Sequence, residues 1–193
     1  MAIVNLGILA HVDAGKTSLT ERILFETGVI ASVGSVDKGT TQTDTLALER
    51  ARGITIKSAV VSFHLKALKV NLIDTPGHAD FVAEVERSLR VLDGVVLVVS
   101  AVEGVQPQTR RLVRAIRSAG LPMLTFVNKI DCLGARGEAL LVDIRRTLRL
   151  RVVAMNAATG LGGRAAAVVT RDRESAPWRD PVVDLLAETN ERV

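Results

Sequence analysis

The sequence has few of the features that mark secreted or membrane proteins. It holds one cysteine among 193 residues, so no disulfide forms within the chain, and we expect a reducing compartment. Aromatic residues make up only 3%, so the core must be built from aliphatic side chains. The longest apolar stretch, residues 94–102, is much shorter than the ~18 residues of a membrane span. We therefore expect a cytoplasmic protein without membrane association.

The residues that are present fit a globular chain. Hydrophobic residues make up 48% and charged residues 24% of the sequence, which is typical of one folded domain rather than a disordered chain. No basic and apolar leader opens the chain, so we expect no signal peptide. The net charge of +4 comes mostly from arginines along the chain. Two interpretations stay open: a solvated basic surface, or a preference for polyanionic partners such as RNA.

Strand-like and helix-like segments alternate along the first 150 residues. This alternation predicts an α/β fold, with a mostly parallel sheet, one antiparallel strand and helices on both faces. The short link at 66–68 predicts a hairpin, and hence the antiparallel strand. The polar stretch 31–51 predicts a long loop. The expected strands are 3–10, 54–65, 69–74, 94–101 and 121–127, and the expected helices are 16–27, 79–90, 107–118 and 138–150.

The first expected strand runs into a phosphate-loop pattern. The pattern G-x-x-x-x-G-K-[ST] is matched by AHVDAGKT at residues 10–17, with alanine in place of the first glycine. Gly15 allows backbone N–H groups to turn toward a phosphate, Lys16 neutralises phosphate charge, and the Thr17 hydroxyl suits Mg²⁺. The alternative is an ordinary helix start with a solvated lysine.

Two further motifs supply groups suited to Mg²⁺ and a terminal phosphate. Asp74 ends an expected strand and can hold Mg²⁺ through a water, while Gly77 can offer its N–H to a γ-phosphate. Thr55 follows the long polar loop, and its hydroxyl can reach the same ion. Taken alone, Asp-Thr-Pro-Gly is also a turn sequence and Ile-Thr-Ile a strand start.

A fourth motif selects the base. Asn128, Lys129 and Asp131 form N-K-x-D at the end of an expected strand. A carboxylate accepts two hydrogen bonds from guanine N1–H and its exocyclic amine, a donor pair that adenine lacks. The asparagine can bond the base edge, and the lysine stem can cover the ring. The motif therefore favours a guanine nucleotide.

In this order, the four motifs resemble the G domain of the translational GTPases, a P-loop NTPase fold, over residues 2 to about 135. AHVDAGKT and the stretches 74–91 and 92–110 are similar to the elongation factor G branch. Within it, the loop segments 34–44 and 48–53 resemble the tetracycline resistance proteins of the ribosomal protection type. The resemblance implies a ribosome-stimulated GTPase that binds GTP or GDP with Mg²⁺ and releases tetracycline from the ribosome.

The resemblance also implies roles for matching positions. His78 looks like the catalytic residue that orients the attacking water. Val12 and Ile54 are similar to a pair that gates this histidine, and core packing is the alternative interpretation of both. Thr17 and Thr55 ligate Mg²⁺, and Asp74 supports it through water. The implied nucleotide-binding residues are Asp13, Ala14, Gly15, Lys16, Thr17, Ser18, Thr55, Asp74, Gly77, Asn128, Lys129 and Asp131.

The last 40 residues carry the weakest pattern. We expect a GTP-binding core at 1–150 and a remainder at 151–193, with a short strand at 151–155, a loop at 160–163 and a helix at 182–191. The family has a fifth, serine-alanine motif that contacts the base. Asn156 and Ala157 are a candidate for it, but helix-like residues 185–188 resemble the insert that precedes that motif, which favours a chain that ends before it.

The resemblance implies the ribosome as partner, through both ribosomal RNA and ribosomal proteins, and we expect a monomer. Three alternatives stay open. One is a translocation factor with the same chemistry but no drug link. Another is a GTP-binding module that is idle without the ribosome. The third, an ATP-dependent kinase-like protein, conflicts with the N-K-x-D motif.

Overall fold

The computed structural model describes residues 2–34, 59–74, 82–171 and 176–190, and they divide into two compact units. The first unit comprises residues 1–100 and 106–128, and the second comprises 101–105 and 129–193. The first unit contains β1 (Ala2–Ala10), α1 (Lys16–Glu26), β2 (Ala59–Leu65), β3 (Leu68–Asp74), α3 (Val82–Leu89), β4 (Gly94–Ser100), α4 (Pro107–Ser118) and β5 (Met123–Asn128).

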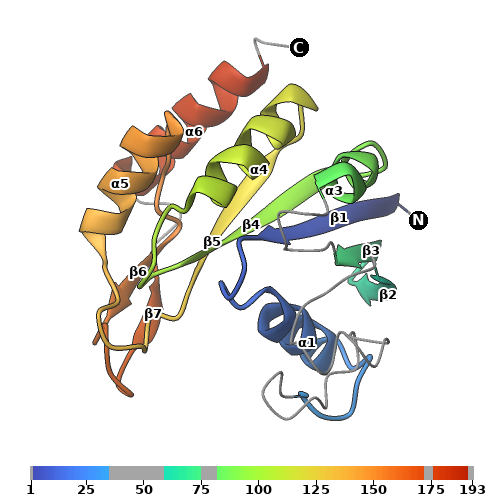
Figure 1. Ribbon diagram of the computed structural model, residues 1–193, viewed down its shortest axis with the longest axis horizontal. Coiled ribbons are helices and arrows are strands. Elements are labelled where there is room, and N and C mark those ends of the chain that lie inside the picture. The colour runs from blue at the N-terminus through green and yellow to red at the C-terminus, as the bar shows by residue number, and fades with distance from the viewer. Residues whose placement is uncertain (1, 35–58, 75–81, 172–175, 191–193) are drawn as a thin grey trace. The chain divides into compact units, whose positions relative to one another are not determined.

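A five-stranded sheet in the order β2-β3-β1-β4-β5 forms the frame of the first unit (Figure 1). β1 pairs in parallel with both β3 and β4, β4 pairs in parallel with β5, and β2 is antiparallel to β3. This confirms the predicted α/β class with one antiparallel strand. Because parallel strands end at the same edge, the carboxyl ends of β1, β3 and β5 lie on one side of the sheet, where ligands bind in such sheets.

Apolar side chains on the two faces of the sheet pack against different helices. α1 lies on one face, and α3 and α4 lie on the other (Figure 1). On the α1 face, Ile8, Leu24 and Leu72 are at most 1% exposed. All residues of β4 are buried, as expected for a central strand covered on both faces. The helical spacing of Leu112, Val113 and Ile116 gives α4 its buried side.

The second unit contains α5 (Glu138–Leu148), β6 (Asn156–Thr159), β7 (Ala167–Thr170) and α6 (Ala176–Asn190). β6 and β7 form a two-stranded antiparallel ribbon. The prediction of a strand at 151–155 is wrong, because the extended segment begins at Asn156. Asn156 and Ala157 therefore lie in β6 and not in a base-contacting turn. The loop at 160–163 is confirmed, and the last predicted helix begins six residues earlier than expected, at Ala176.

None of the helices in the described ranges is long and apolar enough to cross a membrane.

Candidate functional site

The loop between β1 and α1 has the shape of an anion cradle. Ala14 N–H donates to the His11 carbonyl (3.2 Å), Asp13 has a φ of 63°, and Gly15 has a φ of 92°. Gly15 is the N-cap of α1, and no described side chain caps the first N–H groups of this helix. Those N–H groups and the helix dipole leave a positive end at the loop. The geometry fits a phosphate bound by backbone.

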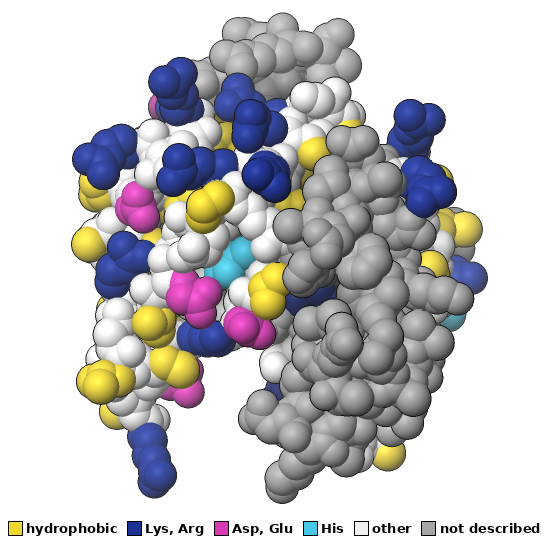
Figure 2. Space-filling view, viewed as in Figure 1, with side chains coloured by type: hydrophobic (Ala, Val, Ile, Leu, Met, Phe, Trp, Pro, Cys, Tyr) yellow, Lys and Arg dark blue, Asp and Glu magenta, His cyan; other side chains and the backbone are white. Residues whose placement is uncertain are grey.

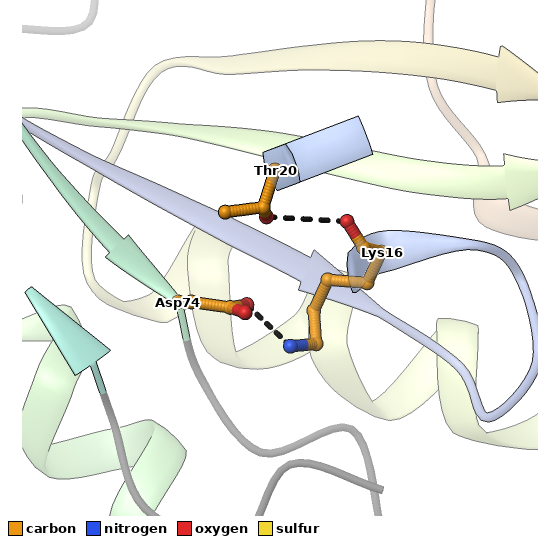
Figure 3. Close-up of polar contacts among 3 residues, drawn as sticks. All are labelled: Lys16, Thr20 and Asp74. Atoms are coloured by element: carbon orange, nitrogen blue, oxygen red, sulfur yellow. Dashed lines mark hydrogen bonds and ion pairs between the residues drawn. The ribbon is translucent and has the colours of Figure 1, made fainter. Parts of the chain in front are cut away.

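Lys16 and Asp74 form an ion pair beside this loop. Lys16 begins α1 and Asp74 ends β3, and the Lys16 ammonium forms an ion pair with Asp74 Oδ1 (Figure 3). The two residues are only 7% and 2% exposed. The backbone of Lys16 is fixed as well, because its carbonyl accepts a hydrogen bond from the Thr20 hydroxyl (3.1 Å). A buried pair of this kind is weakly screened by solvent and salt, so the two side chains hold each other in place beside the loop.

Asn128, at the end of β5, braces the loop from a second side. Its Nδ2 donates to the Ala14 carbonyl at 3.0 Å. The contact is close, since a Cβ added to Gly15 would lie 2.1 Å from Asn128 Nδ2. The sequence predicts a base contact for Asn128, and its tie to the loop backbone is an additional finding. The first unit thus brings Gly15, Lys16, Asp74 and Asn128 together.

The start of α4 holds the other side of the loop, through residues that sequence reasoning missed. Thr109 Oγ1 shares a hydrogen bond with Nδ1 of the buried His11 (3.1 Å). Gln108 Oε1 accepts from the Val12 N–H at 3.3 Å. Thr109 also belongs to a capping box with Gln106, which fixes the helix start. The sequence signal for these contacts is a glutamine and a threonine in the first turn of a helix. Many helices begin in this way, so the pattern does not indicate a contact with the phosphate loop.

A buried carboxylate on α1 was also missed. Glu21 is 0% exposed, and its Oε2 accepts from the Gly34 N–H at 2.9 Å. Glu21 thereby ties the beginning of the long polar segment to α1. A buried acid inside an apolar helix face gives no distinct sequence pattern, because its partner lies 13 residues away.

The second unit carries the remainder of the N-K-x-D motif. Lys129 has a φ of 61°, and its Nζ lies 3.6 Å from Glu103 Oε1. The Ile130 carbonyl accepts from the Gly162 N–H at 2.9 Å, which ties this loop to the turn of the β6–β7 ribbon. The Asp131 side chain is exposed. It is therefore accessible to a ligand.

The remaining predicted residues fall into two groups. Asp13 and Ser18 are exposed, Thr17 is half-buried, and Ala14 is fully buried in the loop. Val12, one member of the expected gating pair, is 37% exposed. Its partner Ile54 lies outside the described residues, as do Thr55, Gly77 and His78.

Comparison with known proteins identifies relatives of the whole segment. The family described as Elongation factor Tu GTP binding domain matches residues 1–190. The oxytetracycline resistance protein of Streptomyces rimosus is 60% identical over 96% of this chain and 28% of its own length. The tetracycline resistance protein TetP of Clostridium perfringens is 46% identical over 98% of this chain and 29% of its own length.

A solved structure is also similar to this chain. A crystal structure of a Thermus thermophilus protein has a TM-score of 0.78 and 28% identity, over 98% of this chain and 31% of that one. The chain spans less than a third of the length of each of these proteins.

Proposed function

The chain belongs to the elongation factor Tu GTP-binding domain family, and from this premise we propose that it binds and hydrolyses GTP in a ribosome-associated protein. Ribosomal protection against tetracycline is the first candidate for the role of that protein. The names of relatives that are 46% to 60% identical favour it. A translocation factor with the same chemistry is the second candidate. Growth in tetracycline of cells that express the protein, compared with cells that lack it, separates the two.

The observation that carries the proposal is the buried pair of Lys16 and Asp74 beside the uncapped start of α1. An ammonium and a row of N–H groups complement the β- and γ-phosphates of a nucleotide. Bound Mg²⁺ would add charge neutralisation at those phosphates, and Thr17 and Thr55 with Asp74 through water are the residues that would hold it. Hard oxygen donors of this kind fit that ion.

In the proposed reaction a water attacks the γ-phosphorus, the bond to the β–γ bridging oxygen breaks, and the products are GDP and inorganic phosphate. Charge on the phosphoryl group is stabilised by Lys16 and by the N-terminus of α1. Gly77 donates its N–H to the γ-phosphate, and His78 orients the water. The protein contributes position and charge and forms no covalent intermediate.

The direct test is binding of a fluorescent GDP analogue to the 193-residue chain, with unlabelled GTP, GDP and ATP as competitors. We expect GTP and GDP to displace the analogue and ATP to have no effect at concentrations on the order of 100-fold higher. ATP that competes as well as GTP would support the kinase-like alternative. Absence of binding would contradict the proposal for this chain.

Base recognition has its own prediction. In Asp131→Asn the carboxylate that accepts from guanine N1–H and the exocyclic amine becomes an amide. Two charged hydrogen bonds at about 1.5 kcal/mol each are lost, so GTP affinity should fall about 100-fold. Xanthosine 5′-triphosphate should gain affinity, because the amide can donate to its C2 carbonyl. The same competition assay measures both changes.

Asp180→Asn is the matched control, since it also removes one exposed carboxylate from the second unit. It should leave both affinities unchanged. Unaltered GTP affinity in Asp131→Asn would show that Asp131 does not read the base.

A further inference from the structure

One helix of the first unit carries basic side chains and no acidic ones. The sequence has 25 Lys and Arg against 21 Asp and Glu. α4 contains four arginines and no acidic residue, namely Arg110, Arg111, Arg114 and Arg117. The charge of +4 on these 12 residues equals the net charge of the whole chain. α4 is therefore a dense local concentration of positive charge.

All four arginines lie on the outer side of α4. Each is exposed, whereas Leu112, Val113 and Ile116 on the opposite side are at most 8% exposed. Arg110, Arg114 and Arg117 stand at i, i+4 and i+7, which places them along one stripe about 10 Å long at 1.5 Å per residue. Figure 2 shows Lys and Arg side chains gathered on the face where Figure 1 draws α4.

This stripe costs the helix stability when nothing is bound. Like charges at i, i+3 and i, i+4 repel by about 0.2–0.5 kcal/mol per pair. Among the residues that the structure describes, no Asp or Glu forms an ion pair with any of the four. The stripe and the neighbouring Arg111 therefore present four guanidinium groups to water, which suits an anionic partner that spans several of them.

We propose that the stripe Arg110, Arg114 and Arg117, with Arg111 beside it, is a docking surface for structured RNA. A guanidinium forms paired hydrogen bonds with phosphate oxygens, and a row of guanidiniums matches the repeated phosphates of a nucleic-acid backbone. A membrane surface fits less well, because the exposed side of α4 has no apolar residue besides Pro107 to enter the lipid.

The inference deepens the proposed association with the ribosome, and it rests on that proposal for the choice of RNA. It assigns RNA contact to a helix whose first turn also holds the phosphate loop, through Thr109 and Gln108. RNA bound on the outer side of α4 would therefore lie on the same rigid element that supports the nucleotide site.

The test is binding of a fluorescein-labelled RNA hairpin of 20 base pairs to the GDP-loaded chain, measured by anisotropy at several KCl concentrations. The test variant is Arg110→Gln/Arg114→Gln/Arg117→Gln. With three phosphate contacts, affinity of the parent should fall about 40-fold between roughly 50 and 200 mM KCl. The variant should bind more weakly at the lower salt, and its affinity should change little between the two salt concentrations, because each lost contact lowers the salt slope by about one.

The matched control is Lys66→Gln/Lys69→Gln/Arg90→Gln, which removes the same charge from the same unit but from residues outside α4. It should keep the parental RNA affinity and salt slope. An equal effect of both triple variants, or none in the α4 variant, would overturn the inference. Competition by poly-glutamate as strong as that by unlabelled RNA would also overturn it.

The GDP affinity of the α4 variant is measured in parallel, because it distinguishes a failure of the RNA docking surface from a failure of the proposed nucleotide binding. Parental GDP affinity with lost RNA binding supports the docking surface. If the parental chain itself does not bind GDP, that result contradicts the proposed function, whatever the RNA measurement shows.

Discussion

Replacing Gly15 by alanine should lower the affinity of the chain for GDP about 1000-fold, the largest binding defect expected from a single methyl group. Gly15 has a φ of 92°, and the added Cβ would lie 2.1 Å from Asn128 Nδ2. Left-handed backbone costs an alanine about 1–2 kcal/mol, and overpacking a further 1–3 kcal/mol. In the free protein the loop relaxes to avoid both, so binding must restore the strained shape. About 4 kcal/mol corresponds to 1000-fold.

Gly28→Ala separates the clash from the backbone effect. Gly28 also has a positive φ, of 72°, but an added Cβ meets nothing within 4 Å. It lies just after α1 and away from the loop. We expect both variants to lose thermal stability, and only Gly15→Ala to lose GDP affinity, as measured by titration calorimetry and thermal denaturation. Similar GDP affinity of the two variants would show that the Asn128 brace has no part in binding.

The sequence was sufficient to predict the framework of the first unit, because its elements follow local rules. Buried parallel strands are continuous apolar runs, as in residues 94–100, and α4 has the predicted bounds of 107–118 because proline at its first position fixes its start. The second unit was harder to predict. Residues 151–155 form a short, mostly apolar run like that of a strand, yet the observed ribbon begins at 156, where pairing with β7 and not local propensity decides the register.

The site was predicted as a set of motifs and not as a set of contacts. Lys16 and Asp74 were both expected at a phosphate, but their ion pair across 58 residues follows from the adjacency of β1 and β3. The hydrogen bond between His11 and Thr109 joins residues that are 98 positions apart, and no local sequence pattern predicts it. Sequence motifs show which chemical groups a site contains. The contacts that hold those groups in place depend on which strands and helices become neighbours in the fold.

His78→Ala should reduce ribosome-stimulated GTP hydrolysis about 1000-fold while leaving GTP and GDP affinity within about twofold of the parent, in line with the 10²–10⁴-fold that a positioned group of this kind contributes. His78 follows Asp-Thr-Pro-Gly in the sequence and lies outside the described residues, so the prediction rests on the family resemblance and the chemistry. A water must be oriented for attack on phosphorus, and the methyl of alanine cannot hydrogen-bond it. Phosphate release with purified ribosomes measures the loss.

Two further variants make this prediction specific. His78→Gln should recover part of the rate, because an amide can orient the water, as a glutamine does in other GTPases. His64→Ala removes an exposed histidine of β2 and should retain parental turnover. A structural role for His78 would instead lower nucleotide affinity together with turnover, and glutamine would rescue neither. Parental turnover in His78→Ala would remove this histidine from the mechanism and leave hydrolysis to charge stabilisation by Lys16 and the start of α1.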